Sequence, residues 1–548
     1  MIAPRYTKEL IDEYVKKGYW DLALMADDVD KNGRKFPDKE ALVDARHRLT
    51  WAEASQQSDQ LALGLLDLGF KHDDFILVQL PNSVELYLLI VAGEKAGITI
   101  VTAQPTFRHN EISALLRHVE AKGIVIPWAF RDFNYFDMLM EFRPELPKLE
   151  YIIVTGDKIP EGTIAFDSVI QSGAKSKHPP DYLQQTRFKS YEITRVVTTS
   201  GTTGIPKCAV WETSALRCAA GILARRWELR PDDIVGAFYN IIGGGLSIFS
   251  LYGVPLVGTK IVLLDRYTPE GFCELVQKEK ITVAGIVPAE VAQLLEHPDL
   301  DKYDFSSLRL LAHSTTLLPY ELAVRAEERL GCRYVQTYGT MDGGPISSST
   351  LSEPREIRVG TVGRPYDGNE AKIVDDEGNE VPQGETGEVL VKGPTSGSGY
   401  YKNPELNKQT WQEGWFDTTN QGSLDKDGNL IIMGRRRDVI IRGGQNIYPK
   451  ETEDLLVQHP RISEVSVVRM PDRVMGEKAC AFVVPRRGQQ ITFKEVIDFL
   501  KSNKLTPFKL PERLEVREAL PLVPAGQKVD VIQLEKEIAE ILEQEQKQ

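Results

Sequence analysis

The chain has 548 residues, more than one domain usually holds, and its composition of 42% hydrophobic and 26% charged residues suits a globular protein with a sizeable core. A net charge of −13 argues against general binding to nucleic acid or to anionic membrane surfaces. Five scattered cysteines without a CxxC pair, and an N-terminus without the apolar run of a signal peptide, predict a cytoplasmic protein in a reducing compartment.

Short β-branched runs alternate with helical stretches through the first half of the chain. The runs FILVQL, GIVIP and YIIVTG read as strands, and residues 84–96 and 110–120 read as helices. The alternation continues through KIVLL, a helix over residues 269–280, TVAGIVP and LRLLAHS. It predicts an α/β fold of mostly parallel sheets covered by helices. The most apolar stretch, 86–101, contains Glu94 and Lys95, so we expect no membrane span.

The secondary-structure pattern of the sequence changes after residue 360. Short strands separated by Asp-Gly, Glu-Gly and Gln-Gly turns predict a small β subdomain. The segment GRRRDVIIRGGQNIYPKETEDLL reads as a junction, and helix and strand patterns alternate again beyond it, with a charged helix from residue 534. We therefore expect a large N-terminal domain at 1–436 and a small α+β domain at 437–548.

The segment TTSGTTGIPK, residues 198–207, combines five hydroxyl side chains, two glycines and Lys207. Glycines let backbone N–H groups turn inward, the hydroxyls add hydrogen-bond donors, and the lysine adds positive charge, which together suit phosphate oxygens. The segment is not the GxxxxGK[ST] motif, because Pro206 and Cys208 stand where that motif needs Gly and Ser or Thr. The alternative interpretation is a flexible polar loop.

TTSGTTGIPK is very similar to the phosphate-binding signature of the adenylate-forming superfamily, [ST]SGTTGxPK. That superfamily contains acyl- and aryl-CoA ligases, adenylation domains of peptide synthetases, and luciferases. The C-terminal half resembles most the 2,3-dihydroxybenzoate–AMP ligase branch, through PDRVMGEKACAFVVPR and LPLVPAGQKVD. The resemblance covers nearly the whole chain and implies a catalytic role for Lys207. It also implies that the phosphates of ATP are bound by Thr199, Ser200, Gly201, Thr202, Thr203, Gly204 and Lys207.

YGTMDGG resembles the superfamily's segment in which an aromatic side chain stacks on adenine and a nearby acid binds the Mg²⁺ of ATP. The resemblance implies these roles for Tyr338 and Asp342 and adds Gly339 and Thr340 to the nucleotide site. Stacking suits a purine, and a hard cation prefers carboxylate oxygen. The usual acid is Glu, and the usual Thr before it is Met341 here. Taken alone, Tyr338 also reads as a buried tyrosine at the end of a strand.

GWFDTTNQG resembles GW[FY]RTGDxG, whose Asp accepts hydrogen bonds from both ribose hydroxyls. Asn420 replaces that Asp, so we expect one acceptor oxygen without charge assistance and weaker nucleotide binding. GRRRD resembles GRxKD, which implies that Arg435 binds ribose or phosphate and that Arg437 is the hinge of a mobile C-terminal domain. Arg436 alone reads better as a solvated charge.

Two further segments of the C-terminal part resemble functional segments of the superfamily. GGQNIYPKETED resembles the lining of the thiol tunnel, where Gly443 and Gly444 would let a pantetheine arm pass close to the backbone. PAGQKVD resembles the terminus that carries the catalytic lysine, and Lys528 is the candidate, although one extra residue follows Gly526. A lysine on a loop is otherwise usually just solvated. The expected role of Lys528 is to offset the repulsion between a carboxylate and an α-phosphate.

The segment GAFYNIIGGGLSIFS stands where the superfamily forms part of its acyl pocket. It has no charged side chain, and dihydroxybenzoate ligases carry a His-Asn pair where this chain has Ile242 and Gly243, so only Asn240 is left to read an ortho hydroxyl. AHSTT replaces a glycine-rich strand that flanks adenine and acyl group. We expect a pocket for a hydrophobic acid. The candidate residues are Tyr239, Ile242, Gly243 and Gly244 for the acid and Ser314, Thr315 and Thr316 beside the nucleotide.

These motifs together predict an AMP-forming carboxylate–CoA ligase that uses ATP, Mg²⁺ and coenzyme A. Its substrate would be an aromatic, alicyclic or medium-chain carboxylic acid, and a homodimer is possible. An alternative is an aryl-AMP ligase that loads the pantetheine arm of a carrier protein. A second alternative is a nucleotide-binding protein that no longer catalyses. Nucleic-acid binding through the three consecutive arginines fits poorly with the acidic net charge.

Overall fold

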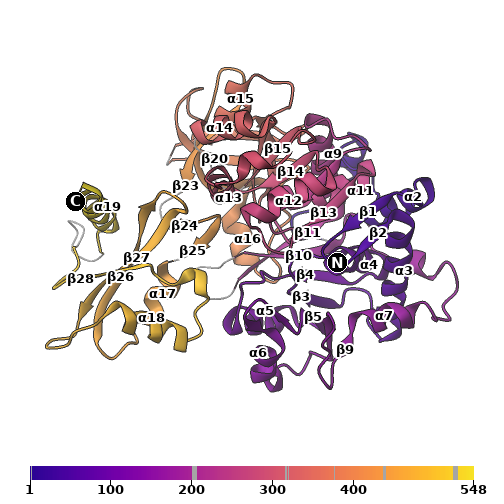
Figure 1. Ribbon diagram of the computed structural model, residues 1–548, viewed down its shortest axis with the longest axis horizontal. Coiled ribbons are helices and arrows are strands. Elements are labelled where there is room, and N and C mark those ends of the chain that lie inside the picture. Colours follow the sequence, from indigo (N-terminus) through magenta and orange to yellow (C-terminus); the bar gives the residue numbers. More distant parts are fainter. Residues whose placement is uncertain are drawn as a thin grey trace. The chain divides into compact units, whose positions relative to one another are not determined.

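The computed structural model describes the chain except residues 2, 200–205, 315–317, 319, 376, 436–439, 448, 522–528 and 548. The chain divides into two compact units (Figure 1). The first unit comprises Met1–Pro105, Leu116–Thr199 and Cys208–Gly434. The second comprises Thr106–Leu115, Ser200–Lys207 and Arg435–Gln548. The second unit thus consists of the C-terminal residues from Arg435 onward and two short segments from the first half of the chain.

A seven-stranded sheet forms one layer of the first unit, and its central strands are parallel, as the alternation of strand and helix signals predicts. Strands β3, β4 and β5 are buried along their whole length, which is why they read as continuous apolar runs. The strand order is β11 (Lys207–Glu212), β10 (Ile193–Thr199), β4 (Thr99–Thr102), β3 (Phe75–Val78), β5 (Gly123–Pro127), β8 (Tyr151–Thr155) and β9 (Ile164–Ala165).

A nine-stranded sheet forms the second layer. Its strands run parallel from β1 to β16, and antiparallel strands close both edges. The order is β18 (Arg364–Pro365), β17 (Gly344–Ser348), β16 (Arg333–Thr340), β15 (Leu310–His313), β14 (Val283–Ile286), β12 (Ile234–Ala237), β13 (Lys260–Leu263), β1 (Glu40–Val43) and β2 (Arg48–Thr50). Helices α12 to α14 pack on one face of this sheet, where Phe272, Leu294 and Ala326 meet Leu311 and Tyr334.

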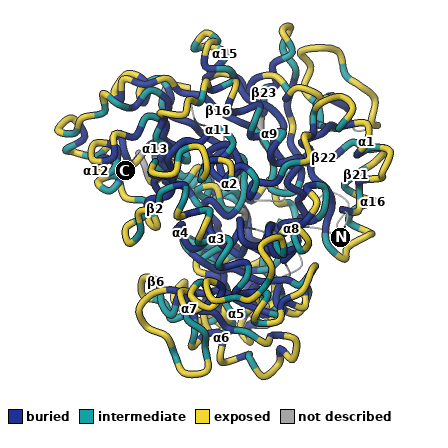
Figure 2. Tube along the Cα trace, turned by 90° about the vertical axis from the view of Figure 1, so that its right-hand side faces the viewer, coloured by how far each residue is buried: buried dark blue, intermediate teal, exposed yellow. Residues whose placement is uncertain are grey.

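Helix α4 lies in the interior of the first unit, and all of its residues are buried. Ser83 caps its first turn, and Gly97, with φ of +72°, ends it in the left-handed conformation. Its buried Lys95 donates to Asp30 and Asp59 at 2.6 and 2.5 Å, which compensates the charge inside the fold. In Figure 2 the strands at the centre of this unit are buried, whereas the connecting loops are exposed.

The helices that surround the two sheets vary from one turn to almost five turns. Helix α5 begins among the residues that group with the second unit. The helices before β12 are α1 (Lys8–Lys16), α2 (Met25–Lys35), α3 (Trp51–Asp67), α4 (Val84–Ala96), α5 (His109–Val119), α6 (Tyr135–Phe142), α7 (Phe166–Gly173), α8 (Tyr182–Thr186) and α9 (Thr213–Arg226). Those after it are α10 (Gly245–Ile248), a π-helix (Phe249–Gly253), α11 (Val254–Val257), α12 (Pro269–Glu279), α13 (Pro288–Leu295), α14 (Tyr320–Leu330), α15 (Arg355–Gly360) and α16 (Pro404–Thr410).

The predicted β subdomain is a five-stranded sheet that completes the first unit. Its strands are β19 (Glu370–Val374), β20 (Gly387–Lys392), β22 (Trp415–Leu424), β21 (Trp411–Gln412) and β23 (Leu430–Arg435). Elsewhere in the chain, β6 (Ala129–Phe130) and β7 (Phe133–Asn134) form a separate two-stranded hairpin. Val389, Val391 and Phe416 form the core of the five-stranded sheet.

All five cysteines are free. Among the described residues, every helix is too short or too polar to cross a bilayer.

The C-terminal part of the second unit is the predicted α+β domain, with a five-stranded sheet and helices on both faces. On one face Val467, Ala481 and Leu500 form a core, and on the other Phe482 packs against Leu534 of α19. Alternating positions of one strand thus serve both cores. The elements are β24 (Ile440–Arg442), β25 (Gln445–Ile447), α17 (Pro449–Leu456), β26 (Ile462–Asp472), β27 (Gly476–Pro485), α18 (Phe493–Ser502), β28 (Arg513–Val516) and α19 (Val531–Lys547).

Candidate active site

Tyr338 and Asn420 meet in the first unit, where the Tyr338 hydroxyl donates to the Oδ1 atom of Asn420 at 2.6 Å. Each lies at an irregularity of its strand. The register of β16 against β17 shifts between Tyr338 and Gly339, and β22 shifts against β20 around Asn420, next to Thr419 with φ of +56°. Bulges of this kind redirect side chains and are frequent beside binding sites. The structure thus joins two residues that the sequence motifs place 82 positions apart.

Asp342 sits in the tight turn between β16 and β17. The Thr340 hydroxyl accepts a hydrogen bond from the N–H of Gly343 at 2.7 Å, so this hydroxyl belongs to the turn itself. Oδ1 of Asp342 accepts from the same N–H at 3.2 Å, and Oδ2 accepts from the Tyr400 hydroxyl at 2.5 Å. Each carboxylate oxygen keeps a further lone pair with which to bind a cation. The donor set therefore suits a hard divalent ion that also holds phosphate and water.

Met341, which stands in place of a threonine, packs toward the predicted acyl segment. A Cβ placed on Gly243 would lie 2.6 Å from both the Met341 Cε and the Val197 Cγ1 atoms, so a larger residue there would displace these side chains. The indole N–H of Trp211 donates to the carbonyl of Met341 at 3.1 Å and holds the turn. The Met341 side chain thus presents an apolar surface at a position where a threonine hydroxyl would have offered a hydrogen-bond donor.

The predicted acyl segment is held by side chains from the region of three neighbouring strands of the seven-stranded sheet: Asn82 beyond β3, Thr102 at the end of β4 and Arg195 within β10. Asn82 donates to the carbonyl of Tyr239 at 2.7 Å and accepts from the N–H of Ile241 at 2.9 Å. Thr102 and Arg195 both donate to the carbonyl of Ile242, at 3.0 and 2.7 Å. Four hydrogen bonds from these three side chains thus fix the backbone of the segment at residues 239–242.

The predicted acyl residues do not all present their side chains in the same way. Tyr239 is 7% exposed, its hydroxyl donates to the carbonyl of Leu246 at 2.6 Å, and its ring covers Gly285. Gly244 has φ of +95° and open space around it. A Cβ on Gly245 would lie 2.9 Å from the Oγ atom of Ser314, so Ser314, a predicted nucleotide-site residue, borders this segment. Tyr239 therefore shapes the segment from within the core.

A cavity of 330 Å³ lies at the β subdomain end of the nine-stranded sheet. Gln336 stands two positions before Tyr338 on β16, so both side chains share a face of the strand. The amide of Gln336 donates to the carbonyls of Val359, at 3.1 Å, and Thr361. The lining residues are Leu318, Tyr320, Gln336, Val359, Gly360, Thr361, Val362, Ile431 and Ile432. This mostly apolar wall suits a flat heterocycle.

Several residues that the sequence singles out lie wholly or partly outside the described residues. Thr199 and Arg435 lie at the ends of β10 and β23, but their side chains are outside the description, and Lys207 begins β11. In the second unit, Gly443 and Gly444 form a two-residue hairpin loop between β24 and β25, with φ of +52° and +82°. The residues wholly outside the description are Ser200, Gly201, Thr202, Thr203, Gly204, Thr315, Thr316, Arg437 and Lys528.

Sequence reasoning missed two buried polar residues next to this site. Arg195 is 2% exposed, and its Nε atom has no hydrogen-bond partner among the described residues. His313 precedes Ser314, stacks on Tyr334, and burial lowers its pKa to about 3, so it is neutral at physiological pH. Arg195 was detectable as the single charge in the apolar run of β10. His313 carries no comparable signal, because one histidine in a strand usually belongs to the core.

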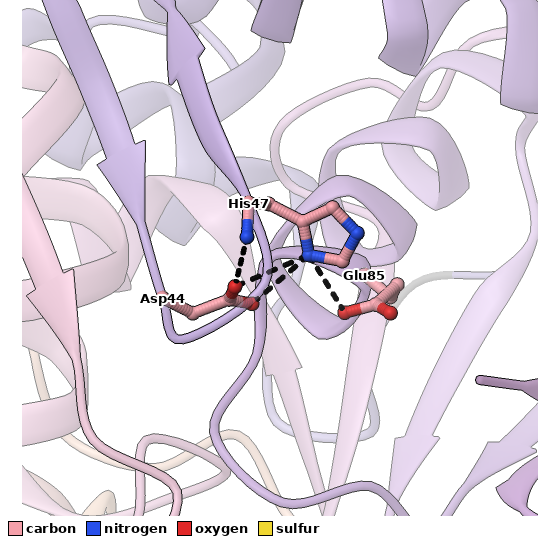
Figure 3. Close-up of side chains that lie close together, drawn as sticks. All are labelled: Asp44, His47 and Glu85. Carbon is pink, nitrogen blue, oxygen red and sulfur yellow. Dashed lines mark hydrogen bonds and ion pairs between the residues drawn. The ribbon is translucent and has the colours of Figure 1, made fainter. Parts of the chain in front are cut away.

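Asp44, His47 and Glu85 form a cluster that could ligate a metal ion, because their ligand atoms lie within 4.8 Å of one another (Figure 3). The Nδ1 atom of His47 lies 3.2 Å from Oδ1 of Asp44, and Oδ2 of Asp44 accepts from the N–H of Val84 at 2.8 Å. The hydrogen bond to Asp44 raises the pKa of His47. Arg46 also contacts Glu85 and would compete with a cation. The cluster therefore fastens the β1–β2 turn to the start of α4.

Comparison with known proteins decides the family. Residues 29–401 match the AMP-binding enzyme family, and residues 451–527 match the AMP-binding enzyme C-terminal domain. The chain belongs to the AMP-binding enzyme family. Its sequence motifs had indicated this adenylate-forming superfamily, and both the family and the α/β architecture with a C-terminal α+β domain are confirmed.

Two curated relatives of this AMP-binding enzyme are named for aromatic acids. One is the 2-hydroxy-7-methoxy-5-methyl-1-naphthoate–CoA ligase of Streptomyces carzinostaticus, 29% identical over 94% of this chain and 93% of the relative. Another is the 2,3-dihydroxybenzoate–AMP ligase of Bacillus subtilis, 29% identical over 97% of each chain. The structure of the amide bond synthetase McbA from Marinactinospora thermotolerans shares the fold, with a TM-score of 0.82 and 24% identity over 94% of this chain and 100% of that one.

AMP-binding ligases use ATP with Mg²⁺, and the described residues of this enzyme fit both. The Asp342 carboxylate has lone pairs left for a cation, and the mostly apolar cavity that Gln336 lines on β16, the strand of Tyr338, suits a base. The relatives differ in what receives the acyl group, so the family itself leaves the choice between CoA and another acceptor open.

Proposed function

We propose that this AMP-binding enzyme is an AMP-forming carboxylate–CoA ligase for a hydrophobic acid. The observation that carries the proposal is the contact of Met341 with Gly243. It joins the turn of the candidate cation ligand Asp342 to an acyl segment without charged side chains. An acid bound along this segment would bring its carboxylate close to the polyphosphate, which reduces the entropic cost of reaction.

The reaction divides into two steps. The carboxylate attacks the α-phosphate of ATP and displaces pyrophosphate, and the thiol of CoA then attacks the acyl-AMP and releases AMP. Lys207 would neutralise phosphate charge, and Lys528 would stabilise the charge that develops as two anions meet. We propose that the C-terminal domain rotates about Arg437 between the steps and exchanges Lys528 for the Gly443–Gly444 hairpin. Such a gating motion would admit the pantetheine arm only after adenylation.

We propose an aromatic, alicyclic or medium-chain acid as the substrate. Asn240 was the residue left to read an ortho hydroxyl, but its amide donates to Gln104 at 3.0 Å and accepts from the N–H of Ile242 at 3.2 Å. Both ends of the amide thus have partners within the protein. The neighbouring Ile242, Gly243 and Met341 offer mainly apolar contact, which favours a hydrophobic acyl group over a polar one.

A second candidate is an aryl-AMP ligase that loads a carrier protein. The likeness to the 2,3-dihydroxybenzoate–AMP ligase of Bacillus subtilis supports it. In this case the pantetheine arm would arrive attached to a protein instead of a nucleotide. The same hairpin at Gly443 and Gly444 would serve either arm, so the acceptor must be measured.

The function is tested by pyrophosphate release with MgATP across aromatic, alicyclic and fatty acids, each with CoA, with a pantetheinylated carrier protein, and with neither. We expect release with hydrophobic acids and a thioester product with CoA. A thioester formed only on carrier protein would support the second candidate. No pyrophosphate and no hydroxamate with any acid would contradict both and leave a nucleotide-binding protein.

We propose a cytoplasmic location for the enzyme. All five cysteines are free, and four of them are buried. Free thiols persist in a reducing compartment, whereas secreted proteins usually pair them.

Changing Asn420→Asp is expected to lower the KM for ATP and the dissociation constant of ATP about 5- to 10-fold, since a carboxylate adds an acceptor and charge assistance worth about 1 kcal/mol. Isothermal titration with ATP measures the constant directly. The control is Asn403→Asp, which adds the same charge at the exposed N-cap of α16, where Asp caps equally well. Unchanged or weaker ATP binding in the first variant would show that Asn420 does not contact ribose.

A further inference from the structure

The carboxylate of Asp342 is held by a residue 58 positions further along the chain, Tyr400. The Tyr400 hydroxyl donates to Oδ2 at 2.5 Å, a length typical of a hydrogen bond to a charged acceptor. Among the residues that the structure describes, Oδ1 accepts the longer bond, 3.2 Å, from the N–H of Gly343. Of these two contacts with described residues, Tyr400 therefore provides the shorter one.

Tyr400 is itself fixed by contacts that do not involve Asp342. It is 2% exposed, and its ring packs edge-on against the ring of Trp411, with the two ring centroids 5.4 Å apart. The side chain of Asn407 accepts from the N–H of Tyr400 at 2.6 Å and donates to its carbonyl at 3.1 Å. The backbone of Tyr400 also forms an antiparallel β-bridge with Ala209 of β11. The position of the hydroxyl is thus set by the fold, and Asp342 conforms to it.

The backbone of the Asp342 turn is braced by the same segment. The N–H of Gly397 donates to the carbonyl of Gly343 at 2.8 Å, and a Cβ on Gly397 would lie 1.7 Å from the carbonyl oxygen of Asp342. The guanidinium of Arg5 in turn donates to the carbonyl of Gly397 at 2.8 Å. The segment before Tyr400 therefore fixes the backbone of the turn, while the hydroxyl fixes the carboxylate.

We propose that Tyr400 is a positioning residue that aims the Asp342 carboxylate at the Mg²⁺ of ATP. This inference rests on the proposed function and names a residue that none of the sequence motifs assigned. Aspartate is one methylene shorter than the glutamate usual at this position, so its carboxylate must be held in the right orientation to reach the cation. Hydrogen bonds to a ligating carboxylate orient it, and their loss usually weakens metal binding 10- to 100-fold. Oδ2 retains a lone pair for the cation after accepting from Tyr400.

The competing explanation is that Asp342 merely satisfies the hydroxyl of a buried tyrosine. In that case removal of the hydroxyl changes the stability of the protein but not its affinity for a cation. The two explanations separate in a metal-binding measurement that needs no turnover. Mn²⁺ serves as the probe, because it prefers the same oxygen ligands as Mg²⁺ and its free concentration is read by electron paramagnetic resonance.

The experiment titrates Mn²⁺ into the full chain saturated with α,β-methylene-ATP, in which the attacked bond is not cleaved. Tyr400→Phe keeps the ring against Trp411 and removes only the hydroxyl. We expect it to weaken Mn²⁺ binding about 10-fold. Tyr401→Phe is the matched control, since the Tyr401 ring contacts Phe75 and His118 instead, and it should leave Mn²⁺ binding unchanged. In an Asp342→Asn background, Tyr400→Phe should cause no further loss.

Equal Mn²⁺ affinity in Tyr400→Phe and the unchanged protein would overturn the proposal. An equal additional loss in the Asp342→Asn background would overturn it too, because the hydroxyl would then act elsewhere. A chain that retains no Mn²⁺ with the nucleotide analogue would refute both this proposal and the Mg²⁺ site. Mn²⁺ binding that depends on Tyr400 in a protein that releases no pyrophosphate would uphold the positioning role and refute only the ligase function.

Discussion

Replacing Lys528 by alanine is expected to reduce ATP–pyrophosphate exchange about 100-fold or more, while thioester formation from supplied acyl-AMP continues at nearly the normal rate. The physical reason is local to the first step. A carboxylate and an α-phosphate repel each other, and a cation placed between them stabilises the charge that builds in the transition state. The second step breaks an existing acyl phosphate bond with a thiol and has no such pair of anions to bring together.

The two half-reactions must be measured separately in the same preparation. Exchange of labelled pyrophosphate into ATP reports the first step, and thioester formation from acyl-AMP and CoA reports the second. The control is Lys536→Ala on α19, where the side chain is 78% exposed and its Nζ atom lies 3.9 Å from Oε1 of Glu540. It should leave both rates unchanged. Equal loss of both half-reactions in Lys528→Ala would contradict a role confined to adenylation.

The sequence predicted those elements whose signals are local. The helix over residues 84–96 forms with these same bounds, because Ser83 caps it and Gly97 stops it, and both signals are short-range. The strands β3, β5 and β8 also lie where apolar runs between turn residues placed them. Their parallel pairing followed from the alternation with helices, which leaves few other topologies.

The sequence could not predict contacts that depend on tertiary structure. The bulge beside Tyr338 and the irregularity around Asn420 bring the two side chains together, but nothing in either motif specifies a hydrogen bond between them. Nor does the segment GAFYNIIGGGLSIFS show by itself that Gly245 begins α10 or that Met341 and Val197 pack at Gly243. The sequence did not single out Tyr400, because its contact with Asp342, 58 positions away, exists only in the folded structure.

Replacing Lys509 by methionine is expected to lower the free energy of unfolding of the second unit by about 3–5 kcal/mol. Its Nζ atom lies 3.0 Å from Oε1 of Glu111 and 2.8 Å from Oε2 of Glu451, and the side chains of Lys509 and Glu111 are 3% and 2% exposed. Burial alone would lower the pKa of Lys509, but the two carboxylates more than offset this and raise it. Without the cation, two carboxylates stay buried without a counter-charge, a far larger loss than that of an exposed pair.

Hydrogen exchange of the α17 backbone amides measures this unit directly, since residues 435–548 contain no tryptophan to report by fluorescence. Lys494→Met is the matched control, because it breaks an ion pair with Asp498 in which the lysine is 85% exposed, and it should leave the stability of the unit nearly unchanged. The triple change Lys509→Met, Glu111→Gln and Glu451→Gln should recover part of the loss by removing the uncompensated charge. If Lys509→Met cost no more than the control, the buried network would not stabilise the unit that carries the Gly443–Gly444 hairpin.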